Sequence, residues 1–425
     1  MLNVNTPRIL PRAQHNISRQ QIDEDVLKVL YRLHRNGHLA YLVGGSVRDL
    51  LLGRQPKDFD IGTDATPSQV RRLFRNCFLV GRRFRLAHIR FKDNKVIEVA
   101  TFRRHPRQDE LPDDPDDHFL FVQNVFGTPG EDAYRRDFTM NALFYDISDF
   151  SVIDYTGGLD DLAQRQIRVI GDPDVRFKED PVRMLRALEF SARLGFSLDD
   201  STLRSIEVNA PLIAEAAPAR IREEIMELFR HKVAARVMRM SKELGLLPHL
   251  LAGYRGDETS LQLLQHVDDR TASGVAIDEA FAIAALFLNR FFRDFPVEKD
   301  THITAALHMA NDIIFSHCRY FSIAQGIRHQ AREMLVGCFR MVRGRGRRGE
   351  RRFVEHPFTP RALELLRLWA LVKPELVAVT EEWSEAIEQR TVPAGEARKK
   401  TRPRRRRPRR KRPEGGQPQA KQLKT

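Results

Sequence analysis

The 425-residue sequence has few cysteines, no long apolar run and no segment typical of an export signal. Its three cysteines, Cys77, Cys318 and Cys338, are odd in number and far apart, which excludes a disulfide framework or a zinc cluster and predicts buried thiols. The longest apolar run, Ala280 to Leu288, is about half of the ~18 residues that cross a bilayer. The N-terminal stretch MLNVNTPRILPR has no apolar core behind a basic start. We therefore expect a cytoplasmic protein without a membrane segment.

Acidic residues are nearly absent from the C-terminal end. Residues 398–425 contain 14 Lys or Arg and one acid, Glu414, so they hold +13 of the formal net charge of +14. Self-repulsion, prolines and a lack of apolar side chains predict a disordered tail that binds polyanions. Because no apolar anchors favour a membrane surface, nucleic acid is the expected partner, with a solubilising extension as the alternative. The residues expected to contact RNA are Arg404, Arg405, Arg406, Arg407, Arg409, Arg410, Lys411 and Arg412.

Hydrophobic patterning divides the rest of the chain into zones. Short β-rich apolar runs alternate with helical segments up to about residue 160, which predicts a mixed α/β head. The acid- and proline-rich stretch 107–118 is expected to be a flexible loop, and from Asp180 onward helical spacing dominates. The expected division is an N-terminal extension at 1–24, a catalytic head at 25–160, a helical neck at 161–230, a helical RNA-binding body at 231–390 and a disordered tail at 391–425.

A further basic cluster, RMVRGRGRRGERR, lies inside the helical half of the chain at Arg340 to Arg352. Two interpretations are open for it. It is either a solvated loop between helices or a patch that faces RNA.

The segment VGGSVRD places two glycines between a strand and a short helix. Gly44 and Gly45 allow backbone N–H groups to approach a phosphate, and the helix N-terminus adds a partial positive charge. Arg48, in the first turn, adds a possible bidentate phosphate contact. The structural alternative is that Ser46 and Asp49 form an S-x-x-D capping arrangement and nothing more.

The motif KDFDIG, which follows, carries two acids at alternate positions. Asp58 and Asp60 point to one face of an extended strand, while the apolar residues face the core. Two adjacent carboxylates repel one another unless a cation lies between them, and Mg²⁺ with substrate phosphates suits such a site. Glu98, flanked by apolar residues in KVIEVATFR, projects from an expected neighbouring strand. Three acids on one face predict a two-metal phosphoryl-transfer site, with an exposed surface acid as the alternative for Glu98.

The order of these and later motifs resembles the class II nucleotidyltransferases of the polymerase-beta-like superfamily, which comprise bacterial poly(A) polymerases and CCA-adding enzymes. GGSVRD with DFD resembles the first motif of that family and RRDFTMNAL the second. DYTGGLDDL resembles the third, a turn between head and neck, and EDPVRMLRALEF resembles the fourth, which recognises the incoming base. The resemblance, which covers roughly residues 39–250, implies an α+β fold: a polymerase-beta-like nucleotidyltransferase head followed by an all-helical neck and body.

The resemblance also implies roles for single residues. It assigns metal binding to Asp58 and Asp60 and the place of a third carboxylate to Glu98. It assigns the triphosphate cradle to Gly44, Gly45 and Arg48, and contacts with the ribose and phosphates to Arg135, Arg136, Asp137 and Asn141.

The start of the fourth motif has its own chemical argument. Asp180 followed by Pro181 is typical of a helix N-cap with proline at N1, and this is the structural alternative. Arg183 lies three residues on, above Asp180 on the same helix face. A carboxylate acceptor beside a guanidinium donor complements adenine and cytosine and opposes guanine and uracil, so no nucleic-acid template is needed. This pair does not by itself separate ATP from CTP.

Within the family, the pattern is most similar to bacterial poly(A) polymerases. LFRNCFLVGRRFRLAHIRF, RRFVEHPFTPRALELLRL and the Arg/Pro-rich tail resemble their counterparts in those enzymes. The expected reaction is Mg²⁺-dependent transfer of AMP from ATP to RNA 3′ ends, with release of pyrophosphate. The alternatives are a CCA-adding tRNA nucleotidyltransferase and an inactive RNA-binding protein of the same fold. The sequence does not define the preferred RNAs, tail length, oligomeric state, protein partners or the means of excluding CTP.

Overall fold

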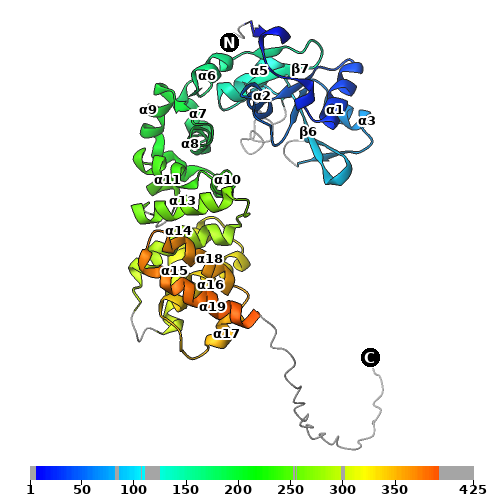
Figure 1. The fold of residues 1–425 in the computed structure, drawn as a ribbon. Helices are drawn as coiled ribbons and strands as arrows, with labels where there is room; N and C mark the ends of the chain where they lie inside the picture. Colours follow the sequence, from blue (N-terminus) through cyan, green and yellow to red (C-terminus); the bar gives the residue numbers. More distant parts are fainter. Residues whose placement is uncertain are drawn as a thin grey trace, which may run out of the picture.

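The structure is a computed structural model that describes residues 6–81, 86–106, 108–110, 125–251, 254, 256–297 and 302–391. The RNA contacts expected at residues 404–412 lie outside the described residues. Of the loop expected at residues 107–118, only 108–110 are described, as one 3-10 turn. Figure 1 shows a curved molecule, with a head of strands and helices at one end and stacked helices leading away from it.

An eight-stranded sheet forms the head, with the order β1-β8-β7-β2-β3-β6-β5-β4. Neighbouring strands are antiparallel, except that β3 and β6 run parallel. β1 lies in the segment expected as an N-terminal extension, so the sheet begins earlier than the predicted head. The strands are β1 (Arg8–Leu10), β2 (Ala40–Val43), β3 (Asp60–Thr63), β4 (Cys77–Val80), β5 (Leu86–Arg90), β6 (Val96–Thr101), β7 (Leu143–Asp146) and β8 (Val152–Asp154).

In the part of the head that the structure describes, four α-helices accompany the sheet, and their apolar faces pack on it. In the first of them, Val26, Val29, Leu30 and Leu33 recur at helical spacing and are buried, while Asp23 caps its N-terminus. The helices are α1 (Glu24–Arg35), α2 (Gly45–Leu51), α3 (Pro67–Leu73) and α5 (Pro129–Arg135).

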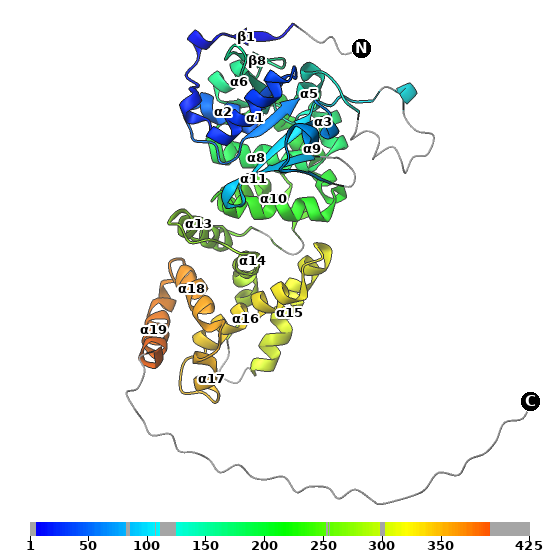
Figure 2. The ribbon, with the colours of Figure 1, turned by 90° about the vertical axis from the view of Figure 1, so that its right-hand side faces the viewer.

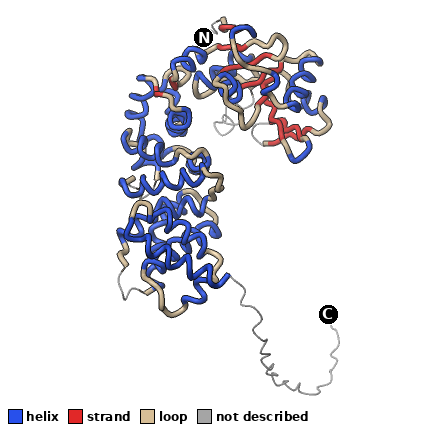
Figure 3. The backbone as a smooth tube through the Cα atoms, in the orientation of Figure 1, coloured by secondary structure: helices blue, strands red, loops and turns tan. Residues whose placement is uncertain are grey.

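The neck and body are built almost entirely from helices, as Figures 2 and 3 show. One difference from the all-helical neck that was expected is a two-stranded parallel sheet of β9 (Gln166–Ile167) and β10 (Ser197–Leu198). Two-residue strands are too short to leave a periodic signal. The helices are α6 (Gly158–Gln164), α7 (Pro173–Glu179), α8 (Val182–Leu194), α9 (Asp200–Asn209), α10 (Pro218–Arg230), α11 (Ala234–Glu243), α12 (Leu247–Leu250), α13 (Glu258–Ala272), α14 (Glu279–Asp294), α15 (Ile303–Tyr320), α16 (Gln325–Val342), α17 (Glu350–Val354), α18 (Thr359–Ala370) and α19 (Val377–Thr391).

Helix α14 is the centre of the body. Its apolar run, residues 280–288, is entirely buried, and the helix packs against α13, α15 and α16. Across the ranges that the structure describes, no helix is long and apolar enough to cross a membrane. Cys77, Cys318 and Cys338 are buried free thiols, which confirms the sequence prediction.

The third motif forms the turn that joins the sheet to the neck. Asp154, buried at the end of β8, accepts four hydrogen bonds of 2.9–3.1 Å from the backbone N–H groups of residues 156–159. Gly158 lies so close to the backbone of Thr139 that an added Cβ would be 2.2 Å from its carbonyl oxygen. A carboxylate and a residue without a side chain are therefore both required to make this turn.

Candidate active site

A cavity of about 640 Å³ opens where the head meets the neck. The residues expected at the nucleotide site all line it, with the exception of Arg135. Its lining residues are Gly44, Gly45, Arg48, Asp58, Asp60, Arg136, Asp137, Asn141, Asp180, Arg183, Arg186, Phe190, Arg193 and Arg220. Residues from the first, second and fourth motifs thus meet at one concave site.

Three carboxylates lie at adjacent positions beside this cavity. Asp60 is the first residue of β3, Asp58 lies just before the strand, and both line the cavity. In the parallel pairing of β3 with β6, Asp60 is directly opposite Glu98, as the sequence predicted for a neighbouring strand. Desolvation and the negative charges of Glu98 and Asp58 raise the pKa of Asp60 to about 6, although Arg136 opposes the shift. Without a bound cation, the three carboxylates therefore do not readily carry their negative charges at the same time.

A second cavity, of about 760 Å³, lies beside the same carboxylates. It shares Asp58 and Asp60 with the first cavity, also reaches Glu98, and is lined by Lys57 and Lys95. The amino group of Lys95 forms ion pairs with acids of the α1 N-terminus. The two aspartates thus face two spaces, which is the arrangement that a two-substrate transfer reaction requires.

The carboxylates fit a metal that substrate helps to hold. Within the described ranges, no three His, Cys, Asp or Glu side chains are grouped closely enough to hold a metal ion by themselves. Mg²⁺ is commonly bound by one or two carboxylates, with substrate phosphates and water completing its coordination. Asp58 and Asp60, both open to the cavity, match this donor set. Glu98 has a protein partner, since its Oε1 atom is 3.3 Å from Nε2 of His88 on β5.

The glycine turn before α2 is shaped by close packing. Gly44 has a φ of +73°, and an added Cβ would lie 2.9 Å from Nη1 of Arg136. The S-x-x-D capping alternative is wrong, because the helix begins at Gly45 and Ser46 is already inside it. The Ser46 hydroxyl donates to the Val43 carbonyl at 3.0 Å instead.

Arg48 lies in the wall of the cavity and is only 3% exposed. Its Nη1 donates to Oδ1 of Asn141 at 2.6 Å and its Nε donates to Oδ1 of Asp49 at 2.8 Å. The guanidinium group also lies over the ring of Phe190 at 5.2 Å. Several of its donors are thus engaged within the protein, and the phosphate contact expected for it stays a prediction.

Arg135 is the one expected nucleotide contact that does not line the cavity. Helix α5 ends at Arg135 and the backbone of Arg136 is extended, so the two neighbouring side chains diverge. Desolvation, with the nearby positive charges of Arg103 and Arg176, lowers the pKa of Arg135 to about 10. Arg136 does reach the cavity, where Asp132 accepts from its Nη2 at 3.0 Å.

Asp137 is the anchor of an ion-pair network that joins head and neck. Its Oδ2 accepts from Nε and Nη2 of Arg186 at 2.9 and 2.7 Å, and Arg186 also donates to Oε1 of Glu224 at 3.3 Å. Desolvation would raise the pKa of Asp137, but the Arg186 charge and hydrogen bonds hold it below its ordinary value. Sequence reasoning did not single out Arg186 as a residue of this site. The signal that could have found it is its position in the fourth motif, three residues after Arg183 and so on the same helix face.

Asp180 does not cap the helix that carries Arg183. Asp180 terminates α7, α8 begins at Val182, and the Asp180 carboxylate pairs with Arg220 at 2.7 Å, so the N-cap alternative is wrong. Arg183 donates through Nη1 to the Arg176 carbonyl at 2.8 Å and to Glu179 at 3.1 Å. Both side chains nevertheless line the cavity, as base recognition requires.

Sequence reasoning missed the aromatic wall of the cavity. The ring of Phe190 is covered by the guanidinium groups of Arg48, Arg186 and Arg193 at 5.2, 5.3 and 5.0 Å. With Arg136, Arg183 and Arg220, the cavity is lined by six arginines, which favours an anionic ligand.

Two family models match parts of the chain. The model described as "Poly A polymerase head domain" matches residues 40–168. The model described as "Probable RNA and SrmB- binding site of polymerase A" matches residues 195–255.

Curated relatives extend the similarity further along the chain. The chain is 41% identical to the poly(A) polymerase I of Salmonella typhi, over 89% of this chain and 85% of that protein. It is 36% identical to the poly(A) polymerase I of Haemophilus influenzae, over 89% and 87% of the two chains. The similarity to the CCA-adding enzyme of Bacillus pumilus, at 36% identity, covers only 50% of this chain and 52% of that enzyme.

Solved structures with the same arrangement share about a quarter of the residues. A tRNA-processing enzyme in an apo form matches with a TM-score of 0.61 and 25% identity, over 87% of this chain and 92% of that one. A tRNA nucleotidyltransferase complexed with a primer tRNA and an incoming ATP analogue matches with a TM-score of 0.60 and 25% identity, over 86% and 100%.

The mixed-sheet head, with its carboxylates at an arginine-lined cavity and a helical neck and body behind it, defines a nucleotidyltransferase. Similarity to the CCA-adding enzyme of Bacillus pumilus covers half of the chain, whereas similarity to the poly(A) polymerases covers nearly all of it. The chain belongs to the bacterial poly(A) polymerase I family.

Proposed function

We propose that the protein is a template-independent polynucleotide adenylyltransferase, which adds AMP from ATP to RNA 3′ ends and releases pyrophosphate. The observation that carries the proposal is 41% identity to a poly(A) polymerase I over 85% of that relative's length. The cavity beside Asp58 and Asp60 supports the chemistry. The same bacterial relatives support a cytoplasmic location.

The nucleotide occupies the arginine-lined cavity. The backbone N–H of Gly45, with Arg136 beside it, binds the triphosphate, and Asn141 and Asp137 lie on the ribose side. The Gly44 N–H donates to the Leu143 carbonyl at 3.2 Å, so Gly44 contributes its lack of a side chain. Asp58 and Asp60 would hold two Mg²⁺ ions together with the phosphates, and Glu98 would supply the third carboxylate. Bound Mg²⁺ promotes ionisation of the attacking hydroxyl and stabilises charge on the transferring phosphoryl group.

The acceptor RNA approaches from the second cavity, which shares Asp58 and Asp60 with the first. The 3′-oxygen of the RNA forms a bond to the α-phosphorus of ATP, and the bond from that phosphorus to the bridging oxygen breaks. Pyrophosphate leaves with that oxygen, so no protein nucleophile is needed. Lys57, at the rim of this cavity, is the available cation for the terminal phosphates of the acceptor.

Asp180 and Arg183 recognise the base. Arg183 uses Nη1 for its protein contacts, which leaves Nε and Nη2 as donors to a ring nitrogen. Asp180 keeps a second carboxylate oxygen beside its ion pair with Arg220, and this oxygen accepts from the adenine amino group. The Phe190 wall lies in the same cavity.

A CCA-adding activity is the second candidate, because a CCA-adding enzyme matches half of the chain and tRNA nucleotidyltransferases share its fold. The purified protein would be offered ATP or CTP, each with generic RNA or with tRNA lacking its terminal CCA. Repeated addition of AMP to generic RNA is expected. Addition of CMP to the tRNA alone would favour the CCA-adding activity, and no incorporation would indicate an inactive RNA-binding protein.

A further inference from the structure

A second basic pocket lies in the body, at the opposite end of the molecule from the head. It has a volume of about 340 Å³ and is formed by α16, α17, α19 and the loop between α16 and α17. Five arginines, at positions 340, 343, 347, 348 and 352, line it together with His356. This pocket contains the basic cluster that the sequence left open between a solvated loop and an RNA-facing patch.

Two arginines of this pocket, Arg348 and Arg352, carry charge that no carboxylate of the described residues neutralises. Residues 340–356 contain seven arginines and two acids. One acid, Glu350, accepts from Arg345 at 3.1 Å and from the Gly346 N–H at 2.6 Å, so it is engaged within the loop. Among the described residues, no carboxylate is within ion-pair distance of Arg348 or Arg352. A pocket with this surplus attracts an anion.

The pocket has a rigid floor. Trp383 of α19 is buried, and its Nε1 donates to the Met341 carbonyl at 3.0 Å. The Trp383 ring meets Phe353 edge to face, and Arg340 lies over Phe353 at 5.2 Å. Nε of Arg340 is buried without a hydrogen-bond partner. The contact with Phe353 holds Arg340 in place before any ligand arrives, which lowers the entropic cost of binding at that side chain.

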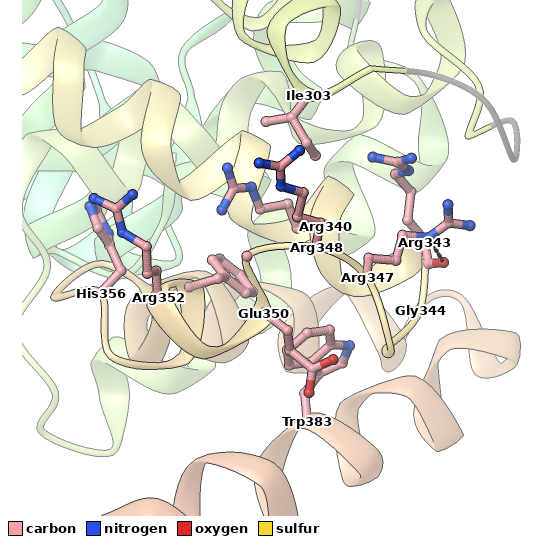
Figure 4. Close-up of a pocket in the computed structure, with 12 residues that line it drawn as sticks. Ile303, Arg340, Arg343, Gly344, Arg347, Arg348, Glu350, Arg352, His356 and Trp383 are labelled. Atoms are coloured by element: carbon pink, nitrogen blue, oxygen red, sulfur yellow. Dashed lines mark hydrogen bonds between the residues drawn. The ribbon is translucent and has the colours of Figure 1, made fainter.

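The arrangement fits an extended polyanion better than a compact ligand. Figure 4 shows the arginine side chains spread across the pocket, with Arg352 and His356 on one side, Arg340 and Arg348 in the middle, and Arg343 and Arg347 on the other. Phe353 and Trp383 are buried, so they offer no exposed apolar anchor for a protein partner. Successive phosphates of one strand match such a row.

We propose that this pocket binds the phosphodiester backbone of the acceptor RNA upstream of its 3′ end, and so acts as a second anchor in the folded body. The inference rests on the proposed function for the identity of the substrate. It assigns RNA binding to Arg348 and Arg352, which belong neither to the catalytic cavity nor to the C-terminal tail.

Because the pocket is distant from the catalytic cavity, its effect on RNA binding should depend on the length of the acceptor RNA. α10, which carries Arg220 of the catalytic cavity, packs on α14, and α14 packs on α16, which carries Arg340. At roughly 8–10 Å per packed helix pair, the two packings separate the outer helix axes by up to about 20 Å, a distance that roughly six stacked nucleotides span at 3.4 Å each. A very short acceptor therefore reaches the catalytic cavity without reaching the pocket.

The test uses the full chain with the double variant Arg348→Gln/Arg352→Gln. A matched control, Arg71→Gln/Arg319→Gln, removes two exposed arginines that lie outside this pocket, outside both cavities of the head and outside residues 195–255. AMP incorporation and RNA affinity would be measured with acceptors of about four and about thirty nucleotides, lengths chosen on either side of the estimated span. Thermal unfolding would verify that each variant is folded.

We expect the pocket variant to bind the long acceptor roughly tenfold more weakly, and to lower the slope of log affinity against log salt by about 1.4, at about 0.7 per phosphate. Its KM for the short acceptor and for ATP should match wild type. An equal loss with both lengths, an equal loss in the control, an unchanged slope, or a change in KM for ATP or in inhibition by pyrophosphate would each overturn the proposal. If wild type adds no AMP to either acceptor, the proposed function fails instead, and binding of the long RNA still tests the pocket.

Discussion

Asp58 and Asp60 are the residues on which the proposed chemistry depends most directly. Asp58→Asn or Asp60→Asn should abolish AMP transfer, because each removes a carboxylate that would hold Mg²⁺. Folding should be nearly unaffected, since the change relieves repulsion between neighbouring charges. Incorporation assays and thermal unfolding are the measurements. Turnover above about a tenth of wild type, equivalent to about 1.4 kcal/mol of lost transition-state stabilisation, would contradict the metal assignment.

Asp60 also predicts a pH dependence of stability in the absence of metal. Its pKa in the folded chain is raised to about 6 from an ordinary 3.8, so the folded state takes up this proton first as the pH falls. As the pH is lowered from about 7 to about 4, the free energy of unfolding of wild type should therefore rise relative to that of an Asn variant.

The measurement is thermal unfolding of wild type and Asp60→Asn with a chelator present. The stability advantage of the variant should shrink as the pH is lowered through the folded pKa of Asp60. A constant difference across this range would show that Asp60 has an ordinary pKa. Glu98→Gln serves as the comparison, because it removes one of the charges that raise the pKa of Asp60.

At the scale of the elements, the turn at Asp154 should be sensitive to substitution. Asp154→Ala leaves four backbone N–H groups of the turn without their acceptor. The expected cost is at least about 1–3 kcal/mol in the free energy of unfolding. Urea denaturation is the measurement, and the exposed Asp160→Ala is the control, expected within about 0.5 kcal/mol of wild type. Equal effects would mean that the carboxylate does not organise the turn.

The elements differ in how much of them the sequence could predict. The strand expected before Gly44 and Gly45 is confirmed as β2 (Ala40–Val43), because glycines end this run and it is apolar throughout. β4 was missed, since all four of its residues are apolar. Its side chains alternate between inside and outside, but this alternation leaves no pattern of apolar and polar residues in the sequence. β7, a continuous apolar run after the second motif, has no periodicity that distinguishes strand from buried helix.

The site shows the same division between local and distant information. The pairing of Asp60 with Glu98 could be predicted, because both lie on strands with a clear inward and outward face. The ion pairs Asp180 with Arg220 and Asp137 with Arg186 could not, because they join residues 40 and 49 positions apart through tertiary packing. Arg135 does not line the cavity for a related reason: α5 ends at this residue, so its side chain diverges from that of Arg136.

At the scale of the whole molecule, the charge of the C-terminal tail should govern RNA affinity but not chemistry. Truncation after Glu396 removes residues 397–425, which hold +13 of the net charge of +14. The truncated enzyme should show a higher KM for RNA, a shallower salt dependence and a near-normal kcat with saturating RNA. Salt titration of RNA affinity is the measurement. Equal slopes for the two proteins would place RNA binding in the folded chain alone.

The first strand of the sheet has a consequence for the behaviour of the protein in solution. β1 pairs with β8 and so covers what would otherwise be a free edge of the head sheet. An uncovered edge strand is a template for association with other chains. Removal of the first eleven residues would therefore change the tendency of the protein to aggregate before it changed any catalytic constant.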